Sequence, residues 1–231
     1  TGLGQTYNSA VTLGADANLV STGNGAIDFV STIDGAHSLS VNTGGLTTFG
    51  GVVGASNALT SLTTDVAGST TLGGNVSTTG AQTYNDAVTL GADATLASTG
   101  SDAIDLAATV NGAHNLTLNT GGLTTFGGVV GGTTALTSLT TNAGGRTMLG
   151  GNVTTSGAQA YNDAVTLGTD VTLATTNGAV SFGSTVDNAT ATKQALTVNA
   201  GTGAVTFTGA LGNGGNGALA SLATNSGTFS A

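Results

Sequence analysis

"GAQTYNDAVTLGADATLASTG", residues 80–100, decides how the chain is organised, because nearly the same phrase ends at Gly23 and begins again at Gly157. One tyrosine marks each copy, and Tyr7, Tyr84 and Tyr161 are equally spaced along the sequence. Their spacing is one third of the chain of 231 residues. In a tandem array each unit packs mainly against its neighbours, so the sequence predicts one continuous domain of three repeats. The repeats are residues 1–77, 78–154 and 155–231.

A shorter period lies within each repeat. An apolar anchor followed by small residues recurs, and the successive steps of 16, 20, 23 and 18 together make one repeat. The third repeat has steps of 15, 25 and 22, and its long step contains the inserted phrase "DNATATKQ". We interpret each step as one coil, which predicts four coils per repeat. The anchors are Leu13, Phe29, Phe49, Leu72, Leu90, Leu106, Phe126, Leu149, Leu167, Phe182, Phe207 and Phe229.

Around the anchors, apolar and polar residues alternate, as in "GAVSFGSTV" at 178–186 and "GAVTFTG" at 203–209. This period of two is typical of β-strands, and the intervening glycine and asparagine clusters are typical of tight turns. A unit of about 20 residues cannot bury its own apolar face, but stacked coils can. The sequence therefore predicts an all-β fold, a right-handed parallel β-helix of about twelve coils spaced ~4.8 Å apart, with the anchors in one internal column.

Composition excludes several classes of function. The chain has 11 acidic residues against two cations, and a net charge of −9, whereas nucleic-acid binding needs many Lys and Arg side chains. It has no cysteine, so disulfides and thiol catalysis are excluded. No run of about 18 apolar residues could span a bilayer as a helix, so we expect no membrane-spanning segment. Both ends fall inside the repeat, so we expect a fragment of a longer chain.

Three phrases carry a resemblance to a known group: "TFGGVVG" at 48–54, "LTSLTT" at 59–64 and "AVTLGADATL" at 87–96. Over the whole chain, the composition and cadence resemble the repeats of bacterial exoproteins of the filamentous-haemagglutinin and autotransporter-passenger type. The resemblance implies a right-handed β-helix that is secreted and displayed at the cell surface or outside the cell as a fibre, adhesin or stalk. The secretion domain of that family does not occur in this sequence.

The recurring polar residues are candidates for catalytic or metal-binding sites. His37 and His114 occupy equivalent turns, but the third repeat has no such histidine, so we favour turn-lining residues over catalysts. Five recurring aspartates have the oxygen ligands that calcium prefers, but side chains that cap turns explain them equally well, and we favour this second interpretation. These aspartates are Asp16, Asp86, Asp93, Asp163 and Asp170.

The two cations do not form a repeated site. Arg146 replaces Ser69 of the preceding repeat, and Lys193 lies in the inserted phrase. Polysaccharide hydrolases need paired carboxyl groups in one groove, and no such pair recurs with a cation or histidine. We therefore expect no catalytic residues, no metal and no cofactor.

Two hypotheses of function follow from the sequence, both for a non-enzymatic extracellular structural protein. One is a passive shaft of a secreted bacterial adhesin, and the other is a matrix filament that self-associates through its coil ends, because an open sheet edge can pair with another chain. Expected partners are other copies, and a host surface, biofilm matrix or polysaccharide. The alternative is a β-helix protein that binds or degrades polysaccharide.

Overall fold

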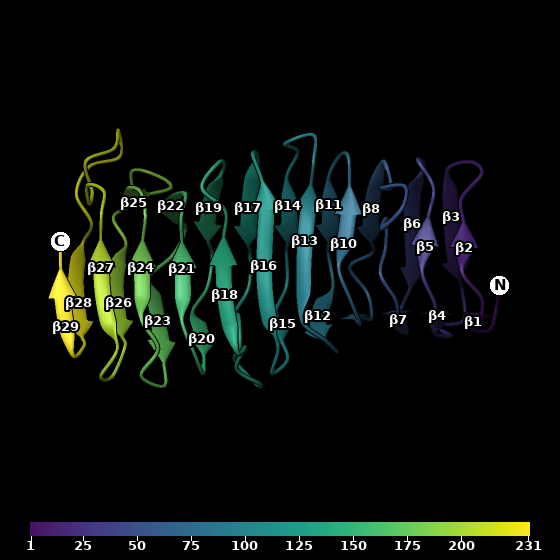
Figure 1. Ribbon diagram of the computed structural model, residues 1–231, viewed down its shortest axis with the longest axis horizontal. Helices are drawn as coiled ribbons and strands as arrows, with labels where there is room; N and C mark the ends of the chain where they lie inside the picture. Colours follow the sequence, from purple (N-terminus) through teal and green to yellow (C-terminus); the bar gives the residue numbers. More distant parts are fainter.

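The computed structural model describes all residues 1–231 and contains strands but no helix. Every paired strand runs parallel to its neighbours, with partners about 22 residues apart in sequence. Figure 1 shows the strands side by side across the long axis of the molecule, with the two chain termini at opposite ends. The predicted all-β parallel solenoid is therefore confirmed.

The strands form three faces, and each turn of the chain visits each face once. Face I contains β1 (Gln5–Tyr7), β4 (Ile27–Phe29), β7 (Leu46–Phe49), β9 (Ser69–Leu72), β12 (Ala87–Leu90), β15 (Val110–Asn111), β20 (Val153–Thr155), β23 (Val171–Thr175), β26 (Ala195–Asn199) and β28 (Ser221–Asn225). Face II contains β2 (Val11–Thr12), β5 (Ile33–Asp34), β10 (Val76–Thr78), β13 (Ala94–Ser98), β16 (Asn115–Thr120), β18 (Ser138–Thr141), β21 (Gln159–Tyr161), β24 (Val180–Phe182), β27 (Ala204–Phe207) and β29 (Thr228–Ser230). Face III contains β3 (Ala17–Ser21), β6 (Ser38–Thr43), β8 (Ser61–Thr64), β11 (Gln82–Tyr84), β14 (Ile104–Leu106), β17 (Leu123–Phe126), β19 (Arg146–Leu149), β22 (Ala164–Leu167) and β25 (Val186–Asn188).

The number of coils differs from the predicted twelve. Face I has six strands, then the bridging residue Val130, then four strands, so ten turns of the chain separate its eleven levels. Between β1 on face I and its equivalent β11 on face III the chain completes three turns and passes two further faces. Each repeat thus makes three and two-thirds turns, and equivalent residues lie on a different face in each repeat.

The difference arises at one of the short steps between anchors. The segment from Leu90 to Leu106 leads from β12 on face I to β14 on face III, which is less than one full turn. Leu90 is instead the Cα partner of Leu72, and Leu106 is the partner of Tyr84. The equivalent steps from Leu13 to Phe29 and from Leu167 to Phe182 also cross only two faces, so counting one such step as a full coil in every repeat produced the predicted number of twelve.

All the anchors except Leu13 and Phe229 form three internal stacks, one begun by each tyrosine on its own face, rather than the single predicted column. Leu13 directly follows β2 and is only partly buried. On face I the rings of Tyr7 and Phe29 stack with centroids 4.9 Å apart, and those of Phe29 and Phe49 stack at 5.6 Å. The stack on face III consists of Tyr84, Leu106, Phe126, Leu149 and Leu167. The stack on face II consists of Tyr161, Phe182 and Phe207. Phe229 was expected in the column but is 51% exposed, because the final strand has no further coil over it.

Loops leave the faces at equivalent points of the repeats. Residues 54–58 bulge from face II and residues 131–135 from face I, and residues 212–218 follow the face III bridge at Leu211. Gly131 has φ +70°, and a Cβ there would meet the carbonyl oxygen of Thr154, so the bulge requires glycine. The predicted insertion is a turn at 189–194 between β25 and β26.

Candidate functional site

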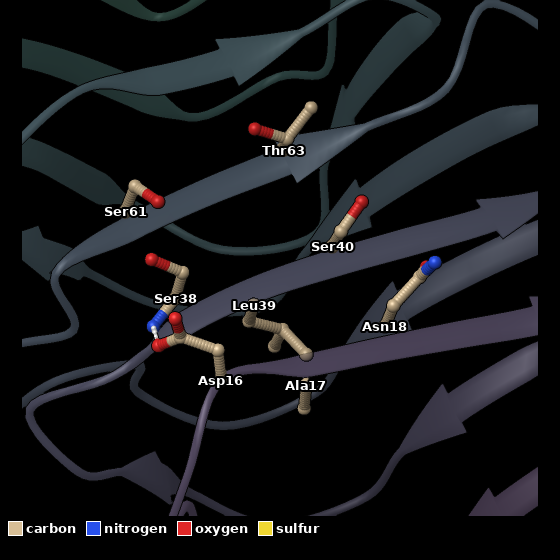
Figure 2. Close-up of a pocket in the computed structure, with 8 residues that line it drawn as sticks. All are labelled: Asp16, Ala17, Asn18, Ser38, Leu39, Ser40, Ser61 and Thr63. Carbon is tan, nitrogen blue, oxygen red and sulfur yellow. Dashed lines mark hydrogen bonds between the residues drawn. The ribbon is translucent and has the colours of Figure 1, made fainter.

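A shallow polar hollow of about 280 Å³ lies on face III near the N-terminal end, across β3, β6 and β8 (Figure 2). Figure 2 shows Asn18, Ser40 and Thr63 on three neighbouring strands, and the three are successive Cα partners. The hollow therefore offers a row of amide and hydroxyl groups about 4.8 Å apart, which suits hydrogen bonding to a polar ligand. Its lining residues are Asp16, Ala17, Asn18, Ser38, Leu39, Ser40, Ser61 and Thr63.

The polar groups of this hollow are partly used by the fold. The carboxylate of Asp16 accepts a hydrogen bond from the backbone N–H of Ser38 at 2.9 Å, the dashed line in Figure 2. The amide oxygen of Asn18 accepts a bond from Asn42 Nδ2 at 2.6 Å. Asp16 is the one titratable residue that lines the hollow, and His37, which does not line it, lies beside Asp16.

Asp16 belongs to a set of aspartates that cap turns of the next coil. Asp93 Oδ1 accepts the backbone N–H of Asn115 at 2.9 Å, and Asp170 Oδ1 accepts that of Ala195 at 2.8 Å. The bond from the Asn115 backbone lowers the pKa of Asp93, because it stabilises the ionised carboxylate. These contacts support the turn-capping interpretation of the three residues.

The two histidines lie beside capping aspartates. His37 Nδ1 is 3.6 Å from Asp16 Oδ1, and His114 Nδ1 is 3.5 Å from Asp93 Oδ1. The backbone N–H of each histidine donates to a glycine carbonyl two residues earlier, within the turn. Both therefore line turns, as expected, and each has one acidic neighbour rather than a cluster.

Asp86 and Asp163 differ from the other aspartates, because they are 3% and 2% exposed and lie inside the solenoid. The prediction that these two side chains cap turns is wrong. Asp86 accepts bonds from the hydroxyls of Thr64 at 2.8 Å and Thr70 at 2.9 Å. Burial raises the pKa of Asp86, since no cation compensates the desolvated charge, and the hydroxyl bonds lower it only in part.

The second buried site repeats the first. Asp163 accepts bonds from Thr141 and Thr147, each at 2.9 Å, and burial again raises the pKa of the carboxyl group. Sequence reasoning missed these threonines, because they come from the preceding coil, 16 and 22 residues before the aspartate. These threonines recur with the period of the long repeat, and this recurrence in the sequence could have revealed them.

A second buried network surrounds the tyrosines. Tyr84 Oη donates to Gln82 Oε1 at 3.1 Å, and Gln82 Nε2 donates to the carbonyl of Ala97 at 2.8 Å. Tyr161 and Gln159 repeat the first of these contacts. Burial raises the pKa of both phenols, which therefore stay protonated as hydrogen-bond donors. Glutamine was not singled out in the sequence.

The two cations stand apart from these carboxyl groups. Arg146 is exposed on β19 and Lys193 is exposed in the turn at 189–194, and neither forms a salt bridge. The structure contains no group of three His, Cys, Asp or Glu side chains placed to hold a metal ion together. The arrangement thus provides hydrogen-bonding surfaces rather than a cluster of reactive groups.

Comparison with protein-family models, with curated proteins and with solved structures finds no match for this chain. The structure contains no helix that is long and apolar enough to cross a membrane.

Proposed function

We propose that this chain is a non-enzymatic structural shaft, a segment of a secreted bacterial adhesin or of a surface or matrix fibre. The observation that carries the proposal is the fractional turn of the repeat. Because each repeat ends two-thirds of a turn out of phase, its polar groups lie on different faces in successive copies. Duplication therefore extends the rod without building one repeated site along a single groove.

The use of the polar residues supports the same proposal. The carboxyl groups of Asp16, Asp93 and Asp170 hold the next coil, and those of Asp86 and Asp163 bond threonine hydroxyls inside. Such contacts join one coil to another along the whole array, which stiffens a rod against bending. Catalysis would instead require titratable groups that converge on a substrate.

Self-association through the coil ends belongs to this proposal. In a chain of these 231 residues, the outer edges of β1 and β29 have no strand partner, and such an edge can pair with another copy. Sedimentation over a range of concentrations, with electron microscopy of the same samples, tests this contact. Rods that lengthen in whole multiples are the expected result, and single rods at every concentration would remove the filament from the proposal.

The shaft itself is tested by the mechanics of the chain. In single-molecule force spectroscopy of the whole chain between two known domains, a shaft unfolds coil by coil with many small force peaks. The same purified chain should leave a panel of acidic and neutral polysaccharides intact. Release of reducing ends by the chain, absent from a heat-denatured control, would contradict the proposal.

The second candidate function is polysaccharide binding, which the hollow in Figure 2 favours through its row of amide and hydroxyl groups. A glycan array probed with the chain and with the variant Ser40→Ala/Thr63→Ala tests it. Specific binding that this variant loses, and that a matched pair on the same face, Thr125→Ala/Thr166→Ala, retains, would establish this function in place of a passive shaft.

A further inference from the structure

Four stretches of the chain have the pattern Asn-x-Ser/Thr, with a residue other than proline in the middle. This pattern is the acceptor motif for N-linked sugars. In the structure, the four motifs differ in whether the nitrogen of the asparagine amide already donates a hydrogen bond within the fold. The four acceptor motifs are Asn75-Val76-Ser77, Asn115-Leu116-Thr117, Asn152-Val153-Thr154 and Asn188-Ala189-Thr190.

Two of the four asparagines have amide groups that the fold already uses. Asn188 is buried, and its Nδ2 donates to the carbonyls of Gly217 at 3.0 Å and Ala218 at 3.1 Å. Asn115 Nδ2 donates to Asp93 Oδ2 at 2.7 Å, and its oxygen accepts from Ser138 at 2.6 Å. A sugar on either nitrogen would displace these bonds.

Asn75 and Asn152 have free amide nitrogens. Both residues are exposed, and each amide oxygen accepts the backbone N–H of the next coil, from Thr95 and Thr172, at 2.8 Å. These bonds fix the amide while Nδ2 of each residue donates to no protein atom. A sugar on Nδ2 therefore disturbs no contact of the fold.

The rest of each motif is also correctly placed. Val76 and Val153 are buried, so in the extended chain the residues on either side of them, including Ser77 and Thr154, face outward. Neither hydroxyl is engaged in a hydrogen bond. Asn75 and Ser77 line the same hollow of about 270 Å³ on face II, beside the loop at 54–58. An enzyme that reads both side chains can thus approach from solvent.

From these observations we propose that Asn75 and Asn152 are acceptor sites for N-linked sugars on the folded solenoid. The sugar donor is a nucleoside-diphosphate hexose, and the catalyst is a glycosyltransferase that recognises the motif. Asn Nδ2 bonds to the anomeric carbon while the bond from that carbon to the phosphate oxygen breaks. The nucleoside diphosphate leaves with the electron pair, and the proton from Nδ2 passes to a base of the transferase.

The two sites lie one repeat apart, so the fractional turn places Asn75 before β10 at face II and Asn152 before β20 at face I. Sugars at these sites would project from two different sides of the rod. This inference goes beyond the shaft function and does not depend on it.

The test uses a purified transferase specific for the motif, with UDP-glucose, and peptide mapping by mass spectrometry. Synthetic peptides of residues 72–80, 112–120, 149–157 and 185–193 first establish that the enzyme accepts all four motifs. The folded chain should then carry one hexose at Asn75 and one at Asn152, and none at Asn115 or Asn188. An unmodified chain, or one labelled equally at all four motifs, overturns the proposal.

Matched variants separate enzymatic recognition from chemical glycation. Ser77→Ala should abolish the hexose at Asn75 and leave that at Asn152 unchanged, whereas Thr117→Ala should change neither. Circular dichroism of both variants checks that the solenoid is intact. A hexose on Asn75 that survives Ser77→Ala would contradict the assignment.

Discussion

At the scale of single residues, the buried carboxyl groups set how stability depends on pH. Asp86 and Asp163 have pKa values raised by burial, and Asp65 raises that of Asp86 further. The folded state therefore binds more protons than the unfolded state in the interval above the ordinary aspartate pKa. Because stability falls with pH wherever the folded state holds more protons, these two groups make the solenoid more stable in mild acid.

We expect the thermal unfolding midpoint to fall as the pH rises from about 4 to about 7, as these carboxyl groups ionise in the folded chain. The variant Asp86→Asn/Asp163→Asn should make this fall smaller, since the amide still bonds the threonines but carries no charge. Burial also raises the pKa of Asp105, which keeps a part of the fall in the double variant. Asp93→Asn is the control and should keep the fall, because the lowered pKa of Asp93 acts in the opposite direction. A fall of equal size in the double variant would exclude the buried groups as its cause.

A single buried hydroxyl without a partner gives a second prediction. Thr124 is buried and its Oγ1 has no hydrogen-bond partner, while the equivalent residue in the third repeat is Val205. Thr124→Val should therefore stabilise the chain by about 1 kcal/mol, because it removes an unsatisfied polar atom and keeps the shape.

Thr147→Val is the matched control, since Thr147 is the Cα partner of Thr124 on the next coil but donates to Asp163. This control should destabilise the chain by about 1–3 kcal/mol, because it leaves the carboxyl group with one donor fewer. Urea unfolding followed by circular dichroism measures both changes. A destabilising Thr124→Val would contradict the account of this site.

At the scale of elements, each strand depends on the stack beneath it. Phe126 on β17 is fully buried between Leu106 of the preceding coil and Leu149 of the next. Phe126→Ala should cost about 3–5 kcal/mol, because it leaves a cavity in the stack. The outward-facing neighbour Thr125→Ala should change stability by less than about 0.5 kcal/mol. Equal effects of the two variants in urea unfolding would mean that the inward face of β17 is misassigned.

Much of this element structure could be predicted from the sequence. The alternation around residues such as Val205 and Phe207 indicates strands, and the anchors are almost all buried because apolar side chains leave water wherever another coil covers them. The turn caps at Asp16, Asp93 and Asp170 also followed from turn chemistry.

Two features could not be predicted from local pattern. The hydrogen bonds of Asp86 depend on threonines that come close only through the register in which the coils stack. The local pattern of apolar and polar residues does not specify that register. The step from Leu90 to Leu106 resembles the other steps but ends on another face. Distance along the chain does not reveal how many corners the backbone turns.

At the scale of the whole molecule, the same repeat folds on any of the three faces. The strands that contain Tyr7, Tyr84 and Tyr161 lie on faces I, III and II, so the repeat tolerates each position. Deleting residues 78–154 joins equivalent strand sequences, and everything after the deletion simply moves to other faces. This chain should fold cooperatively into a rod that is shorter by about 18 Å, from three and two-thirds coils of ~4.8 Å. Small-angle scattering measures the length, and an aggregated or unfolded product would contradict interchangeable faces.

The fractional turn itself is tested most directly by pairs of cysteines, since the natural chain has none. Thr83 and Asp105 are Cα partners on adjacent coils of face III, whereas Thr89 lies on face I and pairs with Asn111. Twelve full coils would instead pair Thr89 with Asp105, across the short step. Cysteines on neighbouring strands are close enough for a disulfide, and those on different faces are not. Under mild oxidation, Thr83→Cys/Asp105→Cys should form an intramolecular disulfide and Thr89→Cys/Asp105→Cys should keep two free thiols; the reverse result would contradict three and two-thirds turns per repeat.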